Sequence, residues 1–230
     1  MMRVSLLAHT PEPERFIASA ARLCYSSSGI SELASNFSDE DIRRILKKIM
    51  ASRHYSALEH ASFTFGIEGI SRACSHQLVR HRIASYNQQS QRYVKYTSDA
   101  EYVIPDSIVK DEEAKKIFLG NWDAAIGAYN ELISMGVSQE DARYVLPNAS
   151  ATKIIVTMNA RELLHFFELR TCQRAQWEIR RLAKKMLLLV LEICPTIFAD
   201  SGPSCFRGPC MEGEMRCDAP PKKETFFRDE

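Results

Sequence analysis

Residues 80–96 (RHRIASYNQQSQRYVKY) hold the side chains whose types and spacing are best suited to chemistry in this chain. Arg80, His81, Arg82 and Arg92 fall within thirteen positions, with serine, asparagine and glutamine between them and no carboxylate. Arginine binds phosphate oxygens through paired hydrogen bonds, and side-chain amides can hydrogen-bond the edge of a pyrimidine. The segment therefore favours a site for a phosphate joined to a heterocycle. A solvated basic turn and contact with a nucleic-acid backbone are the alternatives at this point.

The composition is that of an ordinary globular protein. Of the 230 residues, 45% are hydrophobic and 26% are charged, which excludes a disordered chain, a collagen and a coiled coil. The 30 basic and 29 acidic residues give a net charge of +1, which excludes nucleic-acid binding by bulk charge alone. No apolar run is long enough to span a membrane or to act as a signal peptide, so we expect a cytoplasmic protein without membrane contact.

The hydrophobic spacing predicts helices and strands that are mixed rather than regularly alternating, which indicates an α+β fold with an antiparallel-type sheet. Ser38 and Asn159 are the expected N-caps of two helices, and Glu162 occupies the capping-box position after Asn159. Pro195 is expected to end the last long helix. Strands are expected at residues 3–8, 61–68 and 153–158, helices at residues 12–24, 39–52, 71–82, 111–135, from 159 onward and at 176–194, and loops at residues 26–38 and 80–96.

The composition changes near the C-terminus. We expect one domain over residues 1–200 and a loosely structured extension over residues 201–230, rich in cysteine, proline and charge. Seven cysteines without a secretion signal indicate free thiols, a metal site or redox chemistry more than a disulfide framework. Cys194, Cys205, Cys210 and Cys217 could bind zinc, but their spacing contains no C-x2-C pair. Free thiols are therefore favoured, and no metal ligand is nominated.

Several motifs occur in the order found in one enzyme family. Arg80-His81-Arg82, seven further residues and then Ser90 resemble the signature of the flavin-dependent thymidylate synthases. Gln77, three residues before Arg80, also matches that family. The segments that resemble its other elements are HYSALEH (54–60), DARYVLP (141–147), NAR (159–161), LR (169–170) and AQWEIR (175–180). The resemblance runs in order from about residue 15 to about residue 200.

The resemblance implies a reaction and an assembly. The family converts dUMP to dTMP in de novo biosynthesis, with methylenetetrahydrofolate as carbon donor, FAD as redox cofactor and NADPH or NADH as reductant. Its subunits have an α+β fold and form a homotetramer in which each active site is shared between subunits. The same activity, cofactors and self-association are therefore expected here, with no nucleic-acid partner. The chain has no G-x-G-x-x-G motif, so no Rossmann-type nicotinamide site is expected.

The resemblance also implies roles for individual residues. Arg170 would be the catalytic residue, because a guanidinium beside the uracil ring stabilises the charge that builds as C5 attacks. Ser90 would be a hydrogen-bonding contact rather than a nucleophile, since no general base neighbours it in sequence. The nucleotide would be bound by Gln77, Arg80, Gln88, Gln89, Ser90, Gln91, Arg92, Arg170 and, from a different subunit, Arg143. The flavin would be bound by Ser56, Arg80, His81, Arg82, Gln88, Asn159, Arg161 and His165.

Two positions depart from the family pattern. Gln88 stands where several relatives have a carboxylate, and His165 stands where the family often has asparagine. A purely structural role for His165 is the alternative to flavin contact. For the whole chain, the rival hypotheses are a nucleotide or RNA sensor built on residues 80–96, and a paralogue that keeps the fold without catalysis.

Overall fold

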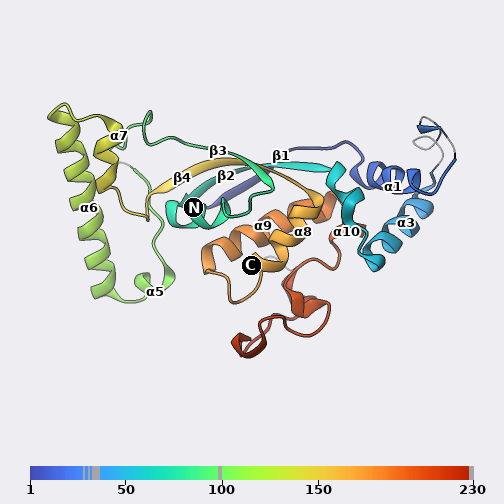
Figure 1. Cartoon of the computed structure of the whole chain (residues 1–230). Coiled ribbons are helices and arrows are strands. Elements are labelled where there is room, and N and C mark those ends of the chain that lie inside the picture. The colour runs from blue at the N-terminus through green and yellow to red at the C-terminus, as the bar shows by residue number, and fades with distance from the viewer. Residues whose placement is uncertain (28, 31, 33–36, 98–99, 228–230) are drawn as a thin grey trace. The chain divides into compact units, whose positions relative to one another are not determined.

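The computed structural model describes residues 1–27, 29–30, 32, 37–97 and 100–227. Four strands form one sheet in the order β1-β2-β4-β3 (Figure 1). Their bounds are Arg3–His9 for β1, Ser62–Ser71 for β2, Ala84–Gln88 for β3 and Ala151–Asn159 for β4. The end of one strand meets the start of its neighbour, as in the hydrogen bonds from Thr10 N to Ser62 O and from Gln89 N to Lys153 O. This pairing is antiparallel, and the predicted α+β class is confirmed.

The chain divides into two compact units, and each strand runs from one unit into the other. Unit 1 comprises Met1–Arg3, Ile67–Arg80 and Tyr86–Ile155, and unit 2 comprises Val4–Gly66, His81–Ser85 and Val156–Glu230. The helices of unit 1 are α4 (Arg72–Leu78), α5 (Asp106–Val109), α6 (Glu112–Ser134), α7 (Gln139–Ala142) and the 3-10 turn η2 (Arg143–Val145). The helices of unit 2 are α1 (Pro13–Leu23), α3 (Asp39–Ser52), α8 (Ala160–Arg170), α9 (Trp177–Ile193), α10 (Pro195–Phe198) and α11 (Lys223–Phe226), with 3-10 turns η1 (Tyr55–His60), η3 (Ser204–Phe206) and η4 (Gly213–Met215).

Local capping explains where two helices of unit 2 begin. The Ser38 hydroxyl accepts a hydrogen bond from Asp41 N at 3.1 Å, and the Asn159 side chain accepts one from Glu162 N at 2.9 Å. Each bond satisfies a backbone N–H that has no partner within its helix. Both predicted N-caps are confirmed.

Aromatic residues fill the core of unit 2. Phe63, on the buried face of β2, packs against Phe198 of α10 with ring centroids 6.0 Å apart, and Phe198 packs against Phe167 of α8 at 5.8 Å. Helices α8 and α9 lie side by side (Figure 1). Phe63, Phe166, Phe167 and Phe198 are all fully buried, so α8 is held rigidly through its inward face.

Two expectations about element boundaries were wrong. The helix predicted at residues 71–82 ends at Leu78, and the polar loop predicted at residues 80–96 contains strand β3. Gln88 shows how a strand with few apolar residues is held: its side chain donates to Ser75 Oγ and to Thr152 Oγ1. Pro195 ends α9 as expected but also begins α10, because proline needs no N–H donor at the first position of a helix.

The C-terminal segment carries only short helical turns, and contacts within unit 2 hold it. Arg207 donates to Glu168 Oε2 at 2.9 Å and to Asp200 O at 2.7 Å, and Lys223 pairs with Asp200. The Phe206 ring packs edge-on against Phe226. In the expected loop at residues 26–38, positions 28, 31 and 33–36 lie outside the described residues. Across the described ranges, no helix is both long and apolar enough to cross a membrane.

Candidate functional site

The imidazole of His81 connects two charged side chains of helix α8. His81 Nδ1 lies 3.1 Å from Glu162 Oε1, and Arg170 Nε donates to His81 Nε2 at 2.9 Å. His81 is 5% exposed and Glu162 is 6% exposed, while Arg170 is half-buried. Because a guanidinium can only donate, Nε2 must accept, and the proton of the neutral ring must be on Nδ1. His81 therefore donates to Glu162 and accepts from Arg170.

Burial and charge keep this imidazole neutral. Desolvation, with repulsion from Arg170 and His165, lowers the pKa of His81 to about 4. Desolvation also raises the pKa of Glu162, although His165 opposes that shift. A neutral ring between a carboxyl group and a guanidinium suits a fixed hydrogen-bonded chain better than a proton carrier at neutral pH.

His165 lies beside this chain of contacts. Its ring centroid is 5.7 Å from that of His81, and ligand-type atoms of His81, Glu162 and His165 lie within 4.8 Å of one another. Such a group could hold a metal ion. Both nitrogens of His81 already have partners, however, and one partner is the cation Arg170. The arrangement therefore favours a hydrogen-bond network over a divalent cation.

A cavity of about 530 Å³ in unit 2 lies next to these residues. Its walls include Asn159, Arg161, Glu162 and His165 from the start of α8 and the cap before it. Arg161 pairs with Glu59 of η1, which also lines the cavity. Apolar side chains complete part of the wall, namely those of Met50, Ile83, Leu164 and Ile197. The volume is in the range of small-molecule sites, and the mixture of apolar walls with a few polar groups is typical of them.

Ser201 gives the same cavity an unsatisfied polar group. The residue lines the wall and is 2% exposed, and its Oγ is itself buried and has no hydrogen-bond partner among the described residues. Leaving a buried hydroxyl unpaired costs free energy, so this part of the wall is less stable than a fully hydrogen-bonded one.

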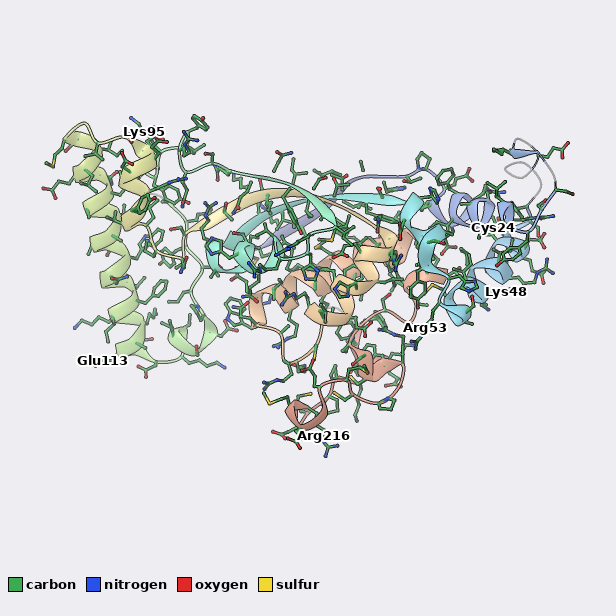
Figure 2. All side chains as sticks on the ribbon, viewed as in Figure 1. Cys24, Lys48, Arg53, Lys95, Glu113 and Arg216 are labelled. Carbon is green, nitrogen blue, oxygen red and sulfur yellow. The ribbon has the colours of Figure 1, made fainter. Side chains whose placement is uncertain are left out.

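Ser56 lies in a second cavity of unit 2, of about 530 Å³. Helices α1 and α3 and the turn η1 form it, and Arg22, Lys48 and His54 give it a basic lining. Figure 2 labels Cys24 and Lys48, which line the cavity from the end of α1 and from α3. Of the expected flavin-binding residues of unit 2, Asn159, Arg161 and His165 line the first cavity and Ser56 lines the second, whereas His81 and Arg82 line neither.

Most residues of the expected nucleotide site belong to unit 1. Arg92 Nε donates to Glu140 Oε2 at 2.7 Å, and Arg143 Nε donates to Glu140 O at 3.1 Å. Ser90 Oγ accepts from the backbone N of Arg92 at 3.1 Å. Glu140 therefore orients two arginines of this site. Gln77 is partly buried and Arg80 is exposed, whereas Arg82 belongs to unit 2 and is exposed.

Arg72 organises the glutamines of the same segment. Its guanidinium donates to Gln89 O at 3.4 Å and to the Gln91 side chain at 3.2 Å. Burial and the nearby charge of Arg143 lower the pKa of Arg72, and Tyr96 opposes the shift. Arg72 is therefore close enough to Arg143 to take part in the positive field of this site.

The sequence reasoning missed four polar side chains at these sites: Glu59, Arg72, Glu140 and Glu162 as a partner of His81. Glu140 stands directly before the DARYVLP segment, and Glu59 lies inside HYSALEH. Their positions in or beside these motifs could have predicted that they pair with basic residues of the site. Nothing in the local sequence connects Glu162 with His81, which is 81 positions away.

The cysteines do not group as the zinc alternative required. All seven are free. Cys194 is fully buried, and desolvation raises the pKa of its thiol. The pKa of Cys205 is raised by burial and by Cys210, Cys172 and Cys217. Cys172, rather than Cys194, therefore lies close enough to Cys205 to affect its pKa, together with Cys210 and Cys217.

Comparisons with known proteins point to one family. The family described as thymidylate synthase complementing protein matches residues 5–196. A Geobacter sulfurreducens protein named flavin-dependent thymidylate synthase is 58% identical over 229 residues, which cover 99% of each chain. Proteins of the same name from Clostridium tetani and Pyrococcus furiosus are 49% and 48% identical, covering 94% of this chain and 93% and 91% of their own.

A solved structure shares the fold. The crystal structure of a UMP/dUMP methylase PolB from Streptomyces cacaoi, bound with 5-Br dUMP, has a TM-score of 0.77 to this chain at 24% identity. The match covers 86% of this chain and 93% of the other. At this identity the likeness concerns the fold alone.

Proposed function

The chain belongs to the family of thymidylate synthase complementing proteins, and on this premise we propose that it is a flavin-dependent thymidylate synthase that converts dUMP to dTMP. The observation that carries the proposal is the pair of arginine-centred sites, one in each unit, at positions where the sequence resembles that family. Unit 1 presents Arg92 and Arg143 on Glu140, and unit 2 presents Arg170 on His81 beside a cavity.

The cavity with Asn159, Arg161 and His165 fits a flavin. Its apolar walls suit a flat ring system, and the side chains of Asn159, Arg161 and His165 suit the nitrogen and oxygen atoms at the ring edge. When bound, FAD would supply the hydride that protein side chains cannot provide. The second cavity, with Ser56 and its basic lining, is assigned to another part of the same cofactor or to the folate.

The residues of unit 1 are assigned to the nucleotide. Arg92 and Arg143 would bind phosphate oxygens, for which the planar guanidinium fork is well suited. Ser90 and the amides of Gln89 and Gln91 would donate further hydrogen bonds. Both Nε2 hydrogens of Gln88 are donated to Ser75 and Thr152, so Gln88 would offer the nucleotide its carbonyl oxygen, and its role would include holding β3 in place.

Arg170 is assigned to the uracil ring. A permanently charged guanidinium favours the electron distribution in which C5 is nucleophilic, because it stabilises negative charge on the ring. Methylenetetrahydrofolate as carbon donor, NADPH or NADH as reductant and a homotetramer with shared sites complete the proposal. They are supported by the resemblance of the motifs around Arg80, Arg143 and Arg170 to those of the family.

The test begins with the visible absorption spectrum of the purified protein with added FAD, and then follows flavin reduction by NADPH as dUMP is titrated. Formation of dTMP from dUMP and methylenetetrahydrofolate is measured in the same samples. We expect Arg170→Ala to bind flavin and to lose turnover by about 100-fold or more. Arg43→Ala, on the exposed face of α3, is the control and should retain turnover.

Failure to bind flavin by a folded oligomer would overturn the proposal and favour the nucleotide or RNA sensor. Flavin binding without dTMP formation would favour the paralogue without catalysis. RNA affinity that falls steeply with salt would separate the sensor from both.

A further inference from the structure

One face of helix α8 carries a spaced set of side chains. Glu162, Phe166 and Arg170 recur every four residues and so lie on the same side of the helix. His81 packs on this side, with its ring edge-on to Phe166 and the centroids 4.9 Å apart. The aromatic contact fixes the plane of the imidazole, and the hydrogen bonds to Glu162 and Arg170 fix which way its two nitrogens face.

The hydrogen bond to His81 also decides which part of Arg170 can contact a substrate. Nε of a guanidinium carries a single hydrogen, and in Arg170 that hydrogen is donated to His81 Nε2. Contact with a substrate ring therefore falls to Nη1 and Nη2. Their direction depends on the Nε bond, because the guanidinium is planar.

We propose that Glu162 is a positioning residue for Arg170: by accepting the Nδ1–H of His81, it fixes the tautomer whose Nε2 holds Arg170 Nε, and so aims the Nη groups at the uracil ring. The inference rests on the proposed function for the identity of that ring. Neither Glu162 nor His81 needs to touch the substrate. Their part is to prevent the guanidinium from rotating among its rotamers, which reduces the entropy lost in the transition state.

The burial of the hydrogen bonds that join Glu162, His81 and Arg170 supports this role. Glu162 is an acidic residue almost without solvent access, and such a position costs free energy unless the carboxyl group has hydrogen-bond partners. As a helix residue it contributes a backbone N–H to the Asn159 cap, and any residue type could do that. The carboxylate itself is used on His81, so the acidic side chain is explained by the contact with the imidazole rather than by the cap.

The first experiment measures the hydrogen bond from Arg170 Nε to His81 and does not depend on turnover. In the full-length protein with arginine labelled with ¹⁵N, the Nε–H signal missing from Arg170→Lys is assigned to Arg170, and its exchange with water is measured. We expect slow exchange in the wild-type chain and an exchange rate about 10-fold higher or more in Glu162→Met, which keeps the length of the side chain and removes the acceptor. Glu178→Met makes the same change at another buried helix glutamate and should leave the rate unchanged.

The second experiment measures catalysis through a double-mutant cycle. Glu162→Met should lower kcat for dTMP formation about 10-fold or more in the wild-type background. In the Arg170→Ala background it should have no further effect, because the group that it positions is gone. Glu162→Asp keeps the charge on a shorter side chain, should give an intermediate kcat, and serves as the second variant if Glu162→Met does not fold.

The outcomes separate this inference from the proposed function. Equal losses from Glu162→Met in both backgrounds, or an exchange rate that Glu162→Met does not change, would overturn the positioning role while thymidylate synthesis stands. A wild-type chain that forms no dTMP would overturn the proposed function and, with it, the assignment of the ring. In that case the exchange measurement still decides whether Glu162 holds Arg170 through His81.

Discussion

At the scale of single residues, the arginines differ in how firmly they are held. Arg170 is bonded through Nε to a buried imidazole, Arg92 and Arg161 pair with glutamates in partly exposed positions, and Arg82 is exposed. Exposed ion pairs contribute little to stability. The ion pairs of Arg92 and Arg161 therefore serve mainly to fix the direction in which each guanidinium points. An arginine without such a partner can adopt many rotamers and is better suited to capture a phosphate than to aim at one ring.

The serine of the signature motif gives a prediction at this scale. Ser90 Oγ accepts from the backbone N of Arg92, and no described hydrogen bond gives it a general base. We expect Ser90→Ala to retain measurable dTMP formation and to raise KM for dUMP, because a binding contact is lost without loss of chemistry. Turnover abolished in a folded variant that still binds dUMP would show that Ser90 takes part in the chemistry.

His81 gives a prediction for pH. Its pKa is lowered from 6.5 to about 4 in the folded chain, so between these values the unfolded chain binds the proton more readily. Stability from neutral His81 is therefore complete above about pH 6.5 and is lost as the pH falls towards about 4. Glu162 has a raised pKa in the folded chain, so its effect on stability has the opposite sign. Its contribution to the free energy of unfolding is lost as the pH rises through that raised pKa.

The contribution of His81 is isolated by comparison with His81→Gln. Denaturant unfolding is measured from pH 4 to pH 7 for both chains, and the difference in unfolding free energy should grow as the pH rises from about 4 to about 6.5. A difference independent of pH would mean that His81 titrates normally and that its buried hydrogen bonds to Glu162 and Arg170 do not form in solution.

At the scale of elements, helix α8 brings together most of the chemistry of unit 2. Its N-cap Asn159 and its residues Arg161, Glu162 and His165 line the cavity, and its last residue is Arg170. The aromatic core behind α8 holds it in place, so a shift in where the helix begins would move several of these side chains together. The cap is therefore both a stability element and a positioning element.

Substitution of the cap separates its two roles. Asn159→Ala removes the acceptor for Glu162 N and should lower the free energy of unfolding by about 1 kcal/mol. Asn159→Asp retains an acceptor and should keep wild-type stability, as measured by denaturant unfolding without FAD. If the aspartate variant is stable but binds FAD more weakly, the amide itself contacts the cofactor; equal stability of the alanine variant would contradict the cap.

The same elements show what could be predicted from sequence. Residues 39–52 and the cap at Asn159 follow from local spacing and local hydrogen bonds, and both agree with the structure. Strand β3 could not be recognised, because its polar side chains are satisfied by Ser75 and Thr152 from other elements. Glu162 was expected to complete a capping box, but its carboxylate contacts His81, a long-range pairing that no local pattern encodes.

At the scale of the whole molecule, Arg170, the proposed catalytic residue, belongs to a different compact unit from the other expected nucleotide-binding residues. The proposed homotetramer would bring such residues together from several copies.

Light scattering after size-exclusion chromatography tests the assembly. We expect a mass four times the 26.2 kDa of one chain. Mixing inactive Arg170→Ala chains with inactive Arg143→Ala chains should restore part of the activity if sites are shared between subunits. A monomer with full dTMP formation would show that one copy contains a complete site.

The wall of the first cavity has a consequence for how the protein is made. The wall draws on side chains from Met50 onward, but Ser201 and Arg207 belong to the segment that follows the last long helix. Synthesis on the ribosome proceeds from the N-terminus, so Ser201 and Arg207 emerge after the four strands and after helices α8 and α9. Any molecule that needs the whole wall must therefore bind after Arg207 has left the ribosome, and these strands and helices can fold before it binds.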